Sequence, residues 1–242
     1  MNVTRDALFA GRITMCQPKH GYRTNVDALH LAAFASTGGR VALAYDLGAG
    51  VGAISLALCA WDVASRVVLV ERDQEAVGLA RENMDLNAWT ARTDVVHGSV
   101  DTTPADVARL VVCNPPYQRP GAGRAPKATV ADARTGDLAP FVRCARRVLG
   151  PRGRACFVYP AYDLSALFTE LLLVGLHPKR LRFVHAKDNR AARIVLVDAR
   201  PGRPGGIIVE PSFIERHAAH DTAALKALLR GDVPTPATSS PT

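Results

Sequence analysis

Two short stretches of the chain carry residue types that can do chemistry. DLGAGVG (residues 46–52) sets three glycines at alternate positions behind a carboxylate, Asp46. NPPY (residues 114–117) sets an amide before two prolines and an aromatic ring. Each stretch directly follows a short apolar run. Each is therefore expected at the carboxyl end of a buried strand, where α/β sheets bind their ligands.

The glycine loop favours a positively charged cofactor. Gly48, Gly50 and Gly52 let the backbone turn sharply, and their spacing differs from the G-x-G-x-x-G of dinucleotide sites. A carboxylate beside the loop repels a pyrophosphate but suits the ammonium and sulfonium groups of S-adenosylmethionine. Glu71, at the end of the next apolar run, can accept hydrogen bonds from ribose hydroxyls. A tight turn without a ligand is the alternative interpretation.

The NPPY stretch is typical of a site that holds a planar amine. Its prolines lack backbone donors and stiffen the chain. The Asn114 side-chain oxygen and the Pro115 carbonyl then offer two acceptors, and an NH2 group that donates to both turns its lone pair toward an incoming methyl group. Tyr117 offers a ring on which a flat base or amide can stack. We therefore predict a catalytic set of Asn114, Pro115, Pro116 and Tyr117, with a proline-rich turn as the alternative interpretation.

Alternating strands and helices must position these motifs. Seven strands are predicted from short β-branched runs at 41–46, 66–71, 94–97, 109–113, 155–159, 180–185 and 193–198. Helical stretches lie at 53–60, 73–87, 137–149 and 162–174. This order predicts right-handed crossovers and one doubly wound, mostly parallel, Rossmann-like α/β domain. The domain is expected to span residues 1–230, with a short extension before the glycine loop and a disordered Pro/Ser/Thr-rich tail over 231–242.

The charge of the chain favours a polyanionic partner. The formal net charge is +8, and basic residues gather after NPPY and again over 179–193. Such clusters are typical of surfaces that follow the phosphates of a nucleic acid. The predicted RNA contacts are Arg119, Arg124, Lys127 and Arg134. A solvated basic surface is the alternative interpretation.

Other classes of protein are disfavoured by simple counts. The chain has no apolar run long enough to cross a bilayer and no signal-peptide pattern at its start, so a cytoplasmic location without a membrane partner is expected. Its five cysteines are odd in number and widely spaced, which argues against a disulfide framework and a zinc knuckle. No metal is expected.

The motifs together resemble a known family. DLGAGVG, VERDQEAVGLARENMDLN and NPPY resemble the class I S-adenosylmethionine-dependent methyltransferases that modify exocyclic or amide nitrogens. QPKHGYRTNVDALHLAAFA (17–35) and VHAKDNRAARIVLVDAR (184–200) are similar to the bacterial tRNA(Val) adenine N(6)-methyltransferase family. The similarity spans roughly residues 10–230. It implies methyl transfer to the exocyclic amine of an adenosine in RNA, in the anticodon loop of a tRNA.

The resemblance also implies a set of cofactor-binding residues. Carried over by position, they are Asp46, Gly48, Ala49, Gly50, Glu71, Arg72 and Asn114. Asp27 matches a segment that such enzymes place beside the cofactor, and an ordinary helix N-cap is its alternative role. The family's usual acid after the third strand, which binds the cofactor adenine, is replaced by His97-Gly98-Ser99. Ser99 or Asp101 is expected to take its place.

Two other functions remain as alternatives. Protein glutamine methyltransferases use NPPY to hold an amide, but they carry a helical substrate domain of about seventy residues before the glycine loop, where this chain has 45 residues before Asp46. A non-catalytic RNA-binding module of the same fold is the second alternative. Intact Asp46, Glu71 and Asn114 argue against it, and a cofactor titration distinguishes the two classes.

Overall fold

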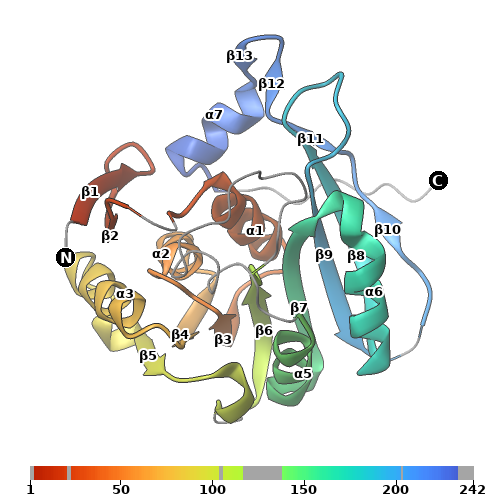
Figure 1. Cartoon of the computed structure of the whole chain (residues 1–242), viewed down its shortest axis with the longest axis horizontal. Helices are drawn as coiled ribbons and strands as arrows, with labels where there is room; N and C mark the ends of the chain where they lie inside the picture. The colour runs from red at the N-terminus through yellow and green to blue at the C-terminus, as the bar shows by residue number, and fades with distance from the viewer. Residues whose placement is uncertain (1–2, 21–22, 104–105, 117–137, 203, 234–242) are drawn as a thin grey trace.

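The computed structural model describes residues 3–20, 23–103, 106–116, 138–202 and 204–233. Within them, a central sheet of nine strands carries helices on both faces (Figure 1). Its order is β10-β8-β9-β7-β6-β3-β4-β5, and β11 also pairs with β8. Of the paired strands, β9 alone runs antiparallel to its neighbours. The doubly wound, mostly parallel α/β fold is therefore confirmed.

The sheet strands follow the predicted runs closely. Their bounds are β3 Val41–Leu47, β4 Ala64–Glu71, β5 Thr93–His97, β6 Ala108–Cys113, β7 Leu149–Pro160, β8 Leu176–His185, β9 Ile194–Pro201, β10 Ile208–Val209 and β11 Phe213–Ile214. All seven predicted strands are present, and the two short strands β10 and β11 extend the sheet beyond them. A strand of two residues has no periodic pattern to detect, so neither strand could be predicted.

The helices divide between the two faces. Their bounds are α1 Val26–Ser36, α2 Ala53–Ala60, α3 Gln74–Leu86, α5 Leu138–Val148, α6 Leu164–Leu173 and α7 Ala223–Arg230, with single 3₁₀ turns at η1 Thr90–Arg92, η2 Val100–Thr102 and η3 Ala161–Asp163. In β6, Leu110 and Val112 pack in the core on the side of α1, α2 and α3. Val111 and Cys113 pack on the side of α5 and α6. Both faces are buried because successive side chains of a strand point to opposite sides.

Two hairpins lie outside the predicted strands. β1 (Val3–Leu8) pairs with β2 (Ile13–Pro18), and β12 (Arg216–His217) pairs with β13 (His220–Asp221). The fully buried Asn83 of α3 fastens the first hairpin: its side chain accepts from Cys16 N at 2.6 Å and donates to Cys16 O and to Val51 O, both at 2.9 Å. The N-terminal hairpin is thereby tied to Val51 in the glycine loop.

The predicted C-terminal boundary falls at the end of α7. Gly231 is the left-handed C-cap of this helix, and its carbonyl accepts hydrogen bonds from Trp61 Nε1 at 3.0 Å and Arg12 Nη2 at 2.7 Å. The remaining residues of the predicted tail, 234–242, lie outside the described residues. No helix in the described part of the chain is long and apolar enough to cross a membrane.

The C-terminal end of α1 is held by two arginines from the sheet. Arg154 donates to Ala35 O at 2.7 Å, and Arg180 donates to Phe34 O at 2.9 Å while its guanidinium lies 4.0 Å from the centre of the Phe34 ring. Cations at a helix C-terminus are favoured by the helix dipole. The fully buried Asp198 balances them, at 3.9 Å from Arg154 and 3.6 Å from Arg180.

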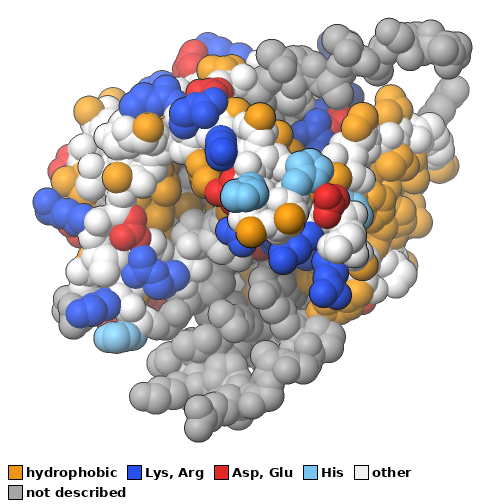
Figure 2. All heavy atoms as spheres, turned by 90° about the horizontal axis from the view of Figure 1, so that it is seen from above, with side chains coloured by type: hydrophobic (Ala, Val, Ile, Leu, Met, Phe, Trp, Pro, Cys, Tyr) orange, Lys and Arg blue, Asp and Glu red, His pale blue; other side chains and the backbone are white. Residues whose placement is uncertain are grey.

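These contacts correct the prediction of a second phosphate-binding cluster over 179–193 for three of its six basic residues. Arg180 and Arg182 both pair with Glu210, and Arg193 pairs with Asp27 and Glu215. Their charges are therefore neutralised inside the fold. Lys and Arg side chains do cover the face formed by α7 and the β12–β13 hairpin, with acidic side chains among them (Figure 2).

Replacing the buried acid at the centre of this arrangement should destabilise the fold strongly. Asp198→Ala leaves Arg154 without a buried counter-charge and Arg180 with Glu210 alone, so we expect the free energy of unfolding to fall by roughly 3–5 kcal/mol. Urea unfolding of the purified variant measures this loss. Asp94→Ala removes an acid that pairs with Arg66 at an exposed site, and it should cost far less. Equal losses of unfolding free energy in the two variants would contradict the role of Asp198 as the buried counter-charge.

Candidate cofactor and substrate site

Strand register brings the predicted site residues into one row. Leu47 of β3 lies opposite Val70 of β4 on one side and Cys113 of β6 on the other. The residues that follow these three directly in the chain are Gly48, Glu71 and Asn114. They therefore lie level with one another at the carboxyl edge of the sheet. Adjacent strands are about 4.8 Å apart. The loop glycine, the acid and the amide predicted from separate motifs therefore meet.

The glycine loop closes onto the end of β4. Gly48 N and Ala49 N donate to Val70 O at 2.9 and 3.0 Å. Gly48 and Gly50 have φ of +70° and +55°, a conformation that side-chain-bearing residues rarely adopt. A Cβ on Gly48 would lie 2.9 Å from the ring of Phe141 in α5, whereas a Cβ on Gly50 would meet nothing within 4 Å. The open space beside Gly50 leaves room for a ligand against the backbone.

Asp46 is a buried acid with one oxygen unsatisfied. Its side chain is fully buried, and Oδ2 accepts a hydrogen bond from Ser55 Oγ of α2 at 2.7 Å. Oδ1 has no hydrogen-bond donor among the described residues. Burial raises the pKa of this carboxyl to about 7, against the lowering effect of the Ser55 hydrogen bonds. A buried acceptor of this kind is suited to a cationic group of a ligand.

Glu71 is fixed as an acceptor at the loop. Oε2 accepts from Gly50 N at 2.8 Å, and Oε1 accepts from Arg72 N at 2.8 Å and Asp73 N at 2.9 Å. These three amides hold the carboxylate between the glycine loop and the start of α3. Each carboxylate oxygen has further acceptor capacity, which two vicinal hydroxyls can use.

Asn114 and the two prolines end β6 at the same edge. Asn114 is half-buried, Pro115 is buried and Pro116 is partly exposed. The Asn114 side chain has no hydrogen-bond partner among the described residues, so its amide oxygen remains available as an acceptor. The fourth predicted catalytic residue, Tyr117, lies outside the described residues, as do Arg119, Arg124, Lys127 and Arg134.

Asp27 lies in the first turn of α1, and the N-cap interpretation for it is wrong. Asn25 is the N-cap, because its side chain accepts a hydrogen bond from Asp27 N at 2.9 Å. The Asp27 carboxylate is fully buried, accepts from Asn25 Nδ2 at 3.0 Å and pairs with Arg193 at the start of β9. Its predicted place beside the cofactor stays a prediction.

The predicted replacements for the adenine-binding acid lie in one exposed turn. Ser99 caps the 3₁₀ turn η2, where its hydroxyl accepts from Asp101 N at 3.2 Å and donates to Asp101 Oδ2 at 3.3 Å. The chain reaches this turn directly from β5, whose His97 pairs with Glu71. Ser99 and Asp101 thus follow the row of site residues, and the choice between them stays open as predicted. Arg72 is exposed.

Sequence reasoning missed three residues that shape the site. Ser55 satisfies Asp46, Phe141 packs over Gly48, and Arg193 neutralises Asp27. Ser55 lies nine residues after Asp46, on the helix that the glycine loop opens, so this helical spacing was a usable signal. Phe141 and Arg193 reach the site from elements distant in the chain, so no local sequence signal pointed to them.

The chain is similar to known proteins along much of its length. The family model described as "Methyltransferase small domain" matches residues 27–162. A protein of Erwinia tasmaniensis named tRNA1(Val) (adenine(37)-N6)-methyltransferase is 30% identical over 175 residues, which cover 70% of this chain and 71% of that protein. A protein of the same name from Tolumonas auensis is 30% identical over 156 residues, and the chain spans 65% of its length.

Solved structures share the fold. A predicted O-methyltransferase of Agrobacterium tumefaciens superimposes with a TM-score of 0.70 at 22% identity, covering 88% of this chain and 100% of that one. At this level of identity the likeness concerns the fold alone.

Acidification should weaken binding of the predicted cofactor, S-adenosylmethionine. Its ammonium favours the ionised form of Asp46, so binding below pH 7 must drive a proton off the carboxyl. The affinity should fall by up to about tenfold per pH unit below the pKa. Calorimetry at pH 8 and pH 6 measures the fall. Asp46→Asn, with no proton to release, should bind more weakly at pH 8 and lose this pH dependence; a wild-type affinity that is equal at both pH values would refute the role.

The same substitution should stabilise the unliganded protein at alkaline pH. The pKa of Asp46 is raised in the folded state from its ordinary value of 3.8 to about 7, so ionisation opposes folding, and stability is lost as pH rises between these values. Asn keeps an acceptor for Ser55 without the charge. Thermal unfolding should therefore show a higher melting temperature for Asp46→Asn than for wild type at pH 8, and a smaller difference at pH 5.

Proposed function

Since the chain belongs to the methyltransferase small domain family, we propose that it transfers a methyl group from S-adenosylmethionine to the exocyclic N6 of an adenosine in tRNA. The observation that carries this proposal is the level row of Gly48, Glu71 and Asn114, with the unsatisfied Asp46 behind it. The names of the relatives from Erwinia tasmaniensis and Tolumonas auensis support adenine N6 as the acceptor and tRNA as the polymer.

The residues present fit this cofactor. Asp46 Oδ1 is a buried acceptor in need of a cationic donor, the space beside Gly50 is open, and Glu71 is held as an acceptor for hydroxyls. We assign the ammonium to Asp46 and the ribose hydroxyls to Glu71, and the adenine to Ser99 or Asp101. When bound, the cofactor supplies an electrophilic methyl group on a sulfonium, which leaves as a neutral thioether.

The chain's own part in the reaction is to position the amine. The Asn114 amide oxygen and the Pro115 carbonyl accept hydrogen bonds from the two N–H groups of N6. The lone pair of N6 is then directed at the methyl group. Holding two reactants in line supplies a large part of the rate enhancement in such transfers. Acceptors that bind the amine more tightly as it gains positive charge add to it. The surplus proton of N6 passes to water.

Access to the adenine requires that it leave its stack. A base within a duplex must be flipped out, whereas bases of an anticodon loop are partly unstacked already. We propose Tyr117 as the stacking surface for the base, and Arg119, Arg124, Lys127 and Arg134 as contacts for the phosphates. These five lie outside the described residues, and the sequence alone supports their roles. We also propose a cytoplasmic location, because that is where a tRNA substrate would be met.

Removing the amide should separate catalysis from cofactor binding. Asn114→Ala deletes one of the two acceptors of the amine, and loss of one such group costs roughly 100- to 1,000-fold in kcat. The dissociation constant for S-adenosylmethionine should change by less than about threefold, because Asp46 and Glu71 remain. Single-turnover methyl transfer and calorimetry measure the two quantities. Unchanged turnover would remove Asn114 from the site.

The substrate is tested by label transfer. Purified protein is given S-adenosylmethionine with a labelled methyl group and total bacterial tRNA that lacks its own modifications, and the digested nucleosides are separated. We expect label in N(6)-methyladenosine. Label in glutamine of added protein extract, with none in RNA, would instead establish the protein glutamine methyltransferase. An RNA that binds with no methyl transfer and no affinity for the cofactor would indicate a non-catalytic module.

A further inference from the structure

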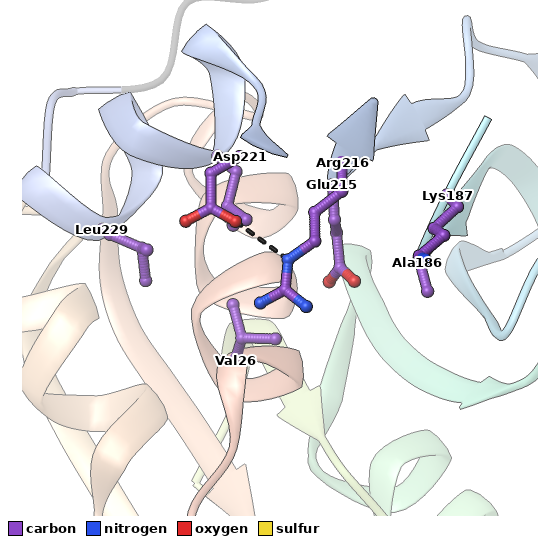
Figure 3. A pocket seen from close by; sticks show the side chains of 8 residues that line it. Val26, Ala186, Lys187, Glu215, Arg216, Asp221 and Leu229 are labelled. Carbon is purple, nitrogen blue, oxygen red and sulfur yellow. Dashed lines mark hydrogen bonds and ion pairs between the residues drawn. The ribbon is translucent and has the colours of Figure 1, made fainter. Parts of the chain in front are cut away.

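A cavity outside the predicted site opens at the same edge of the sheet. It lies between the start of α1, the loop that joins β8 to β9, the end of β11 with the β12–β13 hairpin, and α7 (Figure 3). Its volume is ≈ 220 Å³. We infer that this cavity binds a nucleobase of the RNA substrate, from a nucleotide close to the methylated adenosine. The inference rests on the proposed function, because it names a second contact with the same substrate.

The position of the cavity suits a nearby nucleotide. β8 runs parallel to β6 and is separated from it by β9 and β7, so its carboxyl end lies on the side of the sheet that carries Asn114. Three strand spacings of about 4.8 Å separate the two strands, and the register across β7 and β9 puts Cys113 level with Leu181, four residues before the end of β8. At about 3.3 Å per residue, the two carboxyl ends therefore lie roughly 20 Å apart. Ala186 and Lys187, which line the cavity, follow β8 directly. Nucleotides a few positions apart in an unstacked single strand can bridge this separation.

The size and the walls of the cavity suit one base. An apolar cavity of about 150 Å³ already holds a benzene ring, whereas pockets for drug-sized ligands start near 300 Å³. Val26 of α1 and Leu225 and Leu229 of α7 form its apolar side. Leu229 is 42% exposed although it lines a concave surface. A flat, apolar ligand face would cover it.

The rim of the cavity offers polar groups that match a nucleotide. Arg216 points into the cavity from the hairpin and is held by Asp221 at 2.9 Å, as Figure 3 shows. A guanidinium plane fixed in this way can stack on an RNA base. Lys187 is exposed, and its side chain forms no ion pair with any residue in the described part of the chain. Its ammonium is available for a phosphate beside the bound base.

The wall between the cavity and the predicted site is rigid. Glu215 lines the cavity and is held from behind by His30 at 2.9 Å and by Arg193. Burial alone would raise the pKa of Glu215, but the hydrogen bonds from His30 and Arg193 lower it to about 2, so the acid stays ionised at any pH where RNA is intact. Arg193 also pairs with Asp27, next to Val26. A base in the cavity would therefore sit in fixed register with the start of α1.

An abasic scan tests the inference through binding. The probe is a labelled anticodon stem-loop of the tRNA identified as substrate. If no tRNA is methylated, a stem-loop with the consensus sequence of bacterial tRNAs is used instead. In each probe a single loop nucleotide is made abasic. Fluorescence anisotropy at fixed salt gives each dissociation constant. For wild type, one abasic position near the target adenosine should weaken binding about five- to tenfold. Leu229→Trp fills the cavity, so this variant should bind the intact RNA about as weakly as wild type binds that abasic RNA. Making the same position abasic should then cost the variant no further affinity.

Matched variants separate this effect from general damage. Ala186→Phe fills the cavity from the opposite wall and should abolish the same abasic effect. Leu172→Trp introduces the same side chain at a similarly exposed leucine, 51% exposed on α6, and should keep the wild-type profile. Lys187→Ala should weaken binding of every RNA equally and flatten its salt dependence, whereas Lys226→Ala, an exposed lysine of α7 that does not line the cavity, should do neither.

The outcomes distinguish this inference from the proposed function. An abasic effect that persists in both filled variants overturns the cavity assignment, even if the RNA is methylated normally. An RNA that binds with the expected profile but receives no methyl group supports the cavity and overturns the proposed reaction. A wild-type protein that binds no stem-loop overturns both.

Discussion

Everything at this site depends on the level ends of three parallel strands. A parallel sheet brings the carboxyl ends of its strands to one edge, and the register of β3, β4 and β6 sets Gly48, Glu71 and Asn114 side by side. No long-range contact between their side chains is needed to bring them together. The strands are buried on both faces, so a slip by one residue would exchange the side chains that pack against the two sets of helices. The hydrophobic core therefore fixes the geometry of the polar site.

The candidate site could be proposed from the sequence because its signals are local. The glycine loop and NPPY are each contiguous, and each stands directly after a strand that its apolar residues identify. The capping of α1 shows the limit of local signals. Asn25 and Asp27 both suit an N-cap, and the structure selects Asn25 because its side chain reaches Asp27 N, while Asp27 is drawn inside by Arg193. The partner that decides between them lies 166 residues away.

The basic clusters show the same limit for charge. Arg180, Arg182 and Arg193 look like a surface cluster in the sequence because Asp188 is the one acid among residues 179–193. Their partners, Asp198, Glu210 and Glu215, come from strands that fold back beside them. The net charge of the sequence counts these arginines and acids together, but it does not show which of them form ion pairs. Seven of the longer strands were predicted, whereas β1 and β2, of six residues each, were missed, as were β10 to β13, of two residues each, which are defined by the strands and turns they pair with.

The helix α1 also has a consequence for the order in which the protein assembles. It is complete early in the chain, yet both of its ends are held by side chains that come much later. At its C-terminal end, 119 residues separate Ala35 from Arg154. At synthesis rates of roughly 5–20 residues per second, the helix would wait about 6–24 s for this partner. Through that interval a helix built mainly of Ala, Leu and Phe lies exposed on the nascent chain. An exposed apolar segment of this kind is a binding site for chaperones.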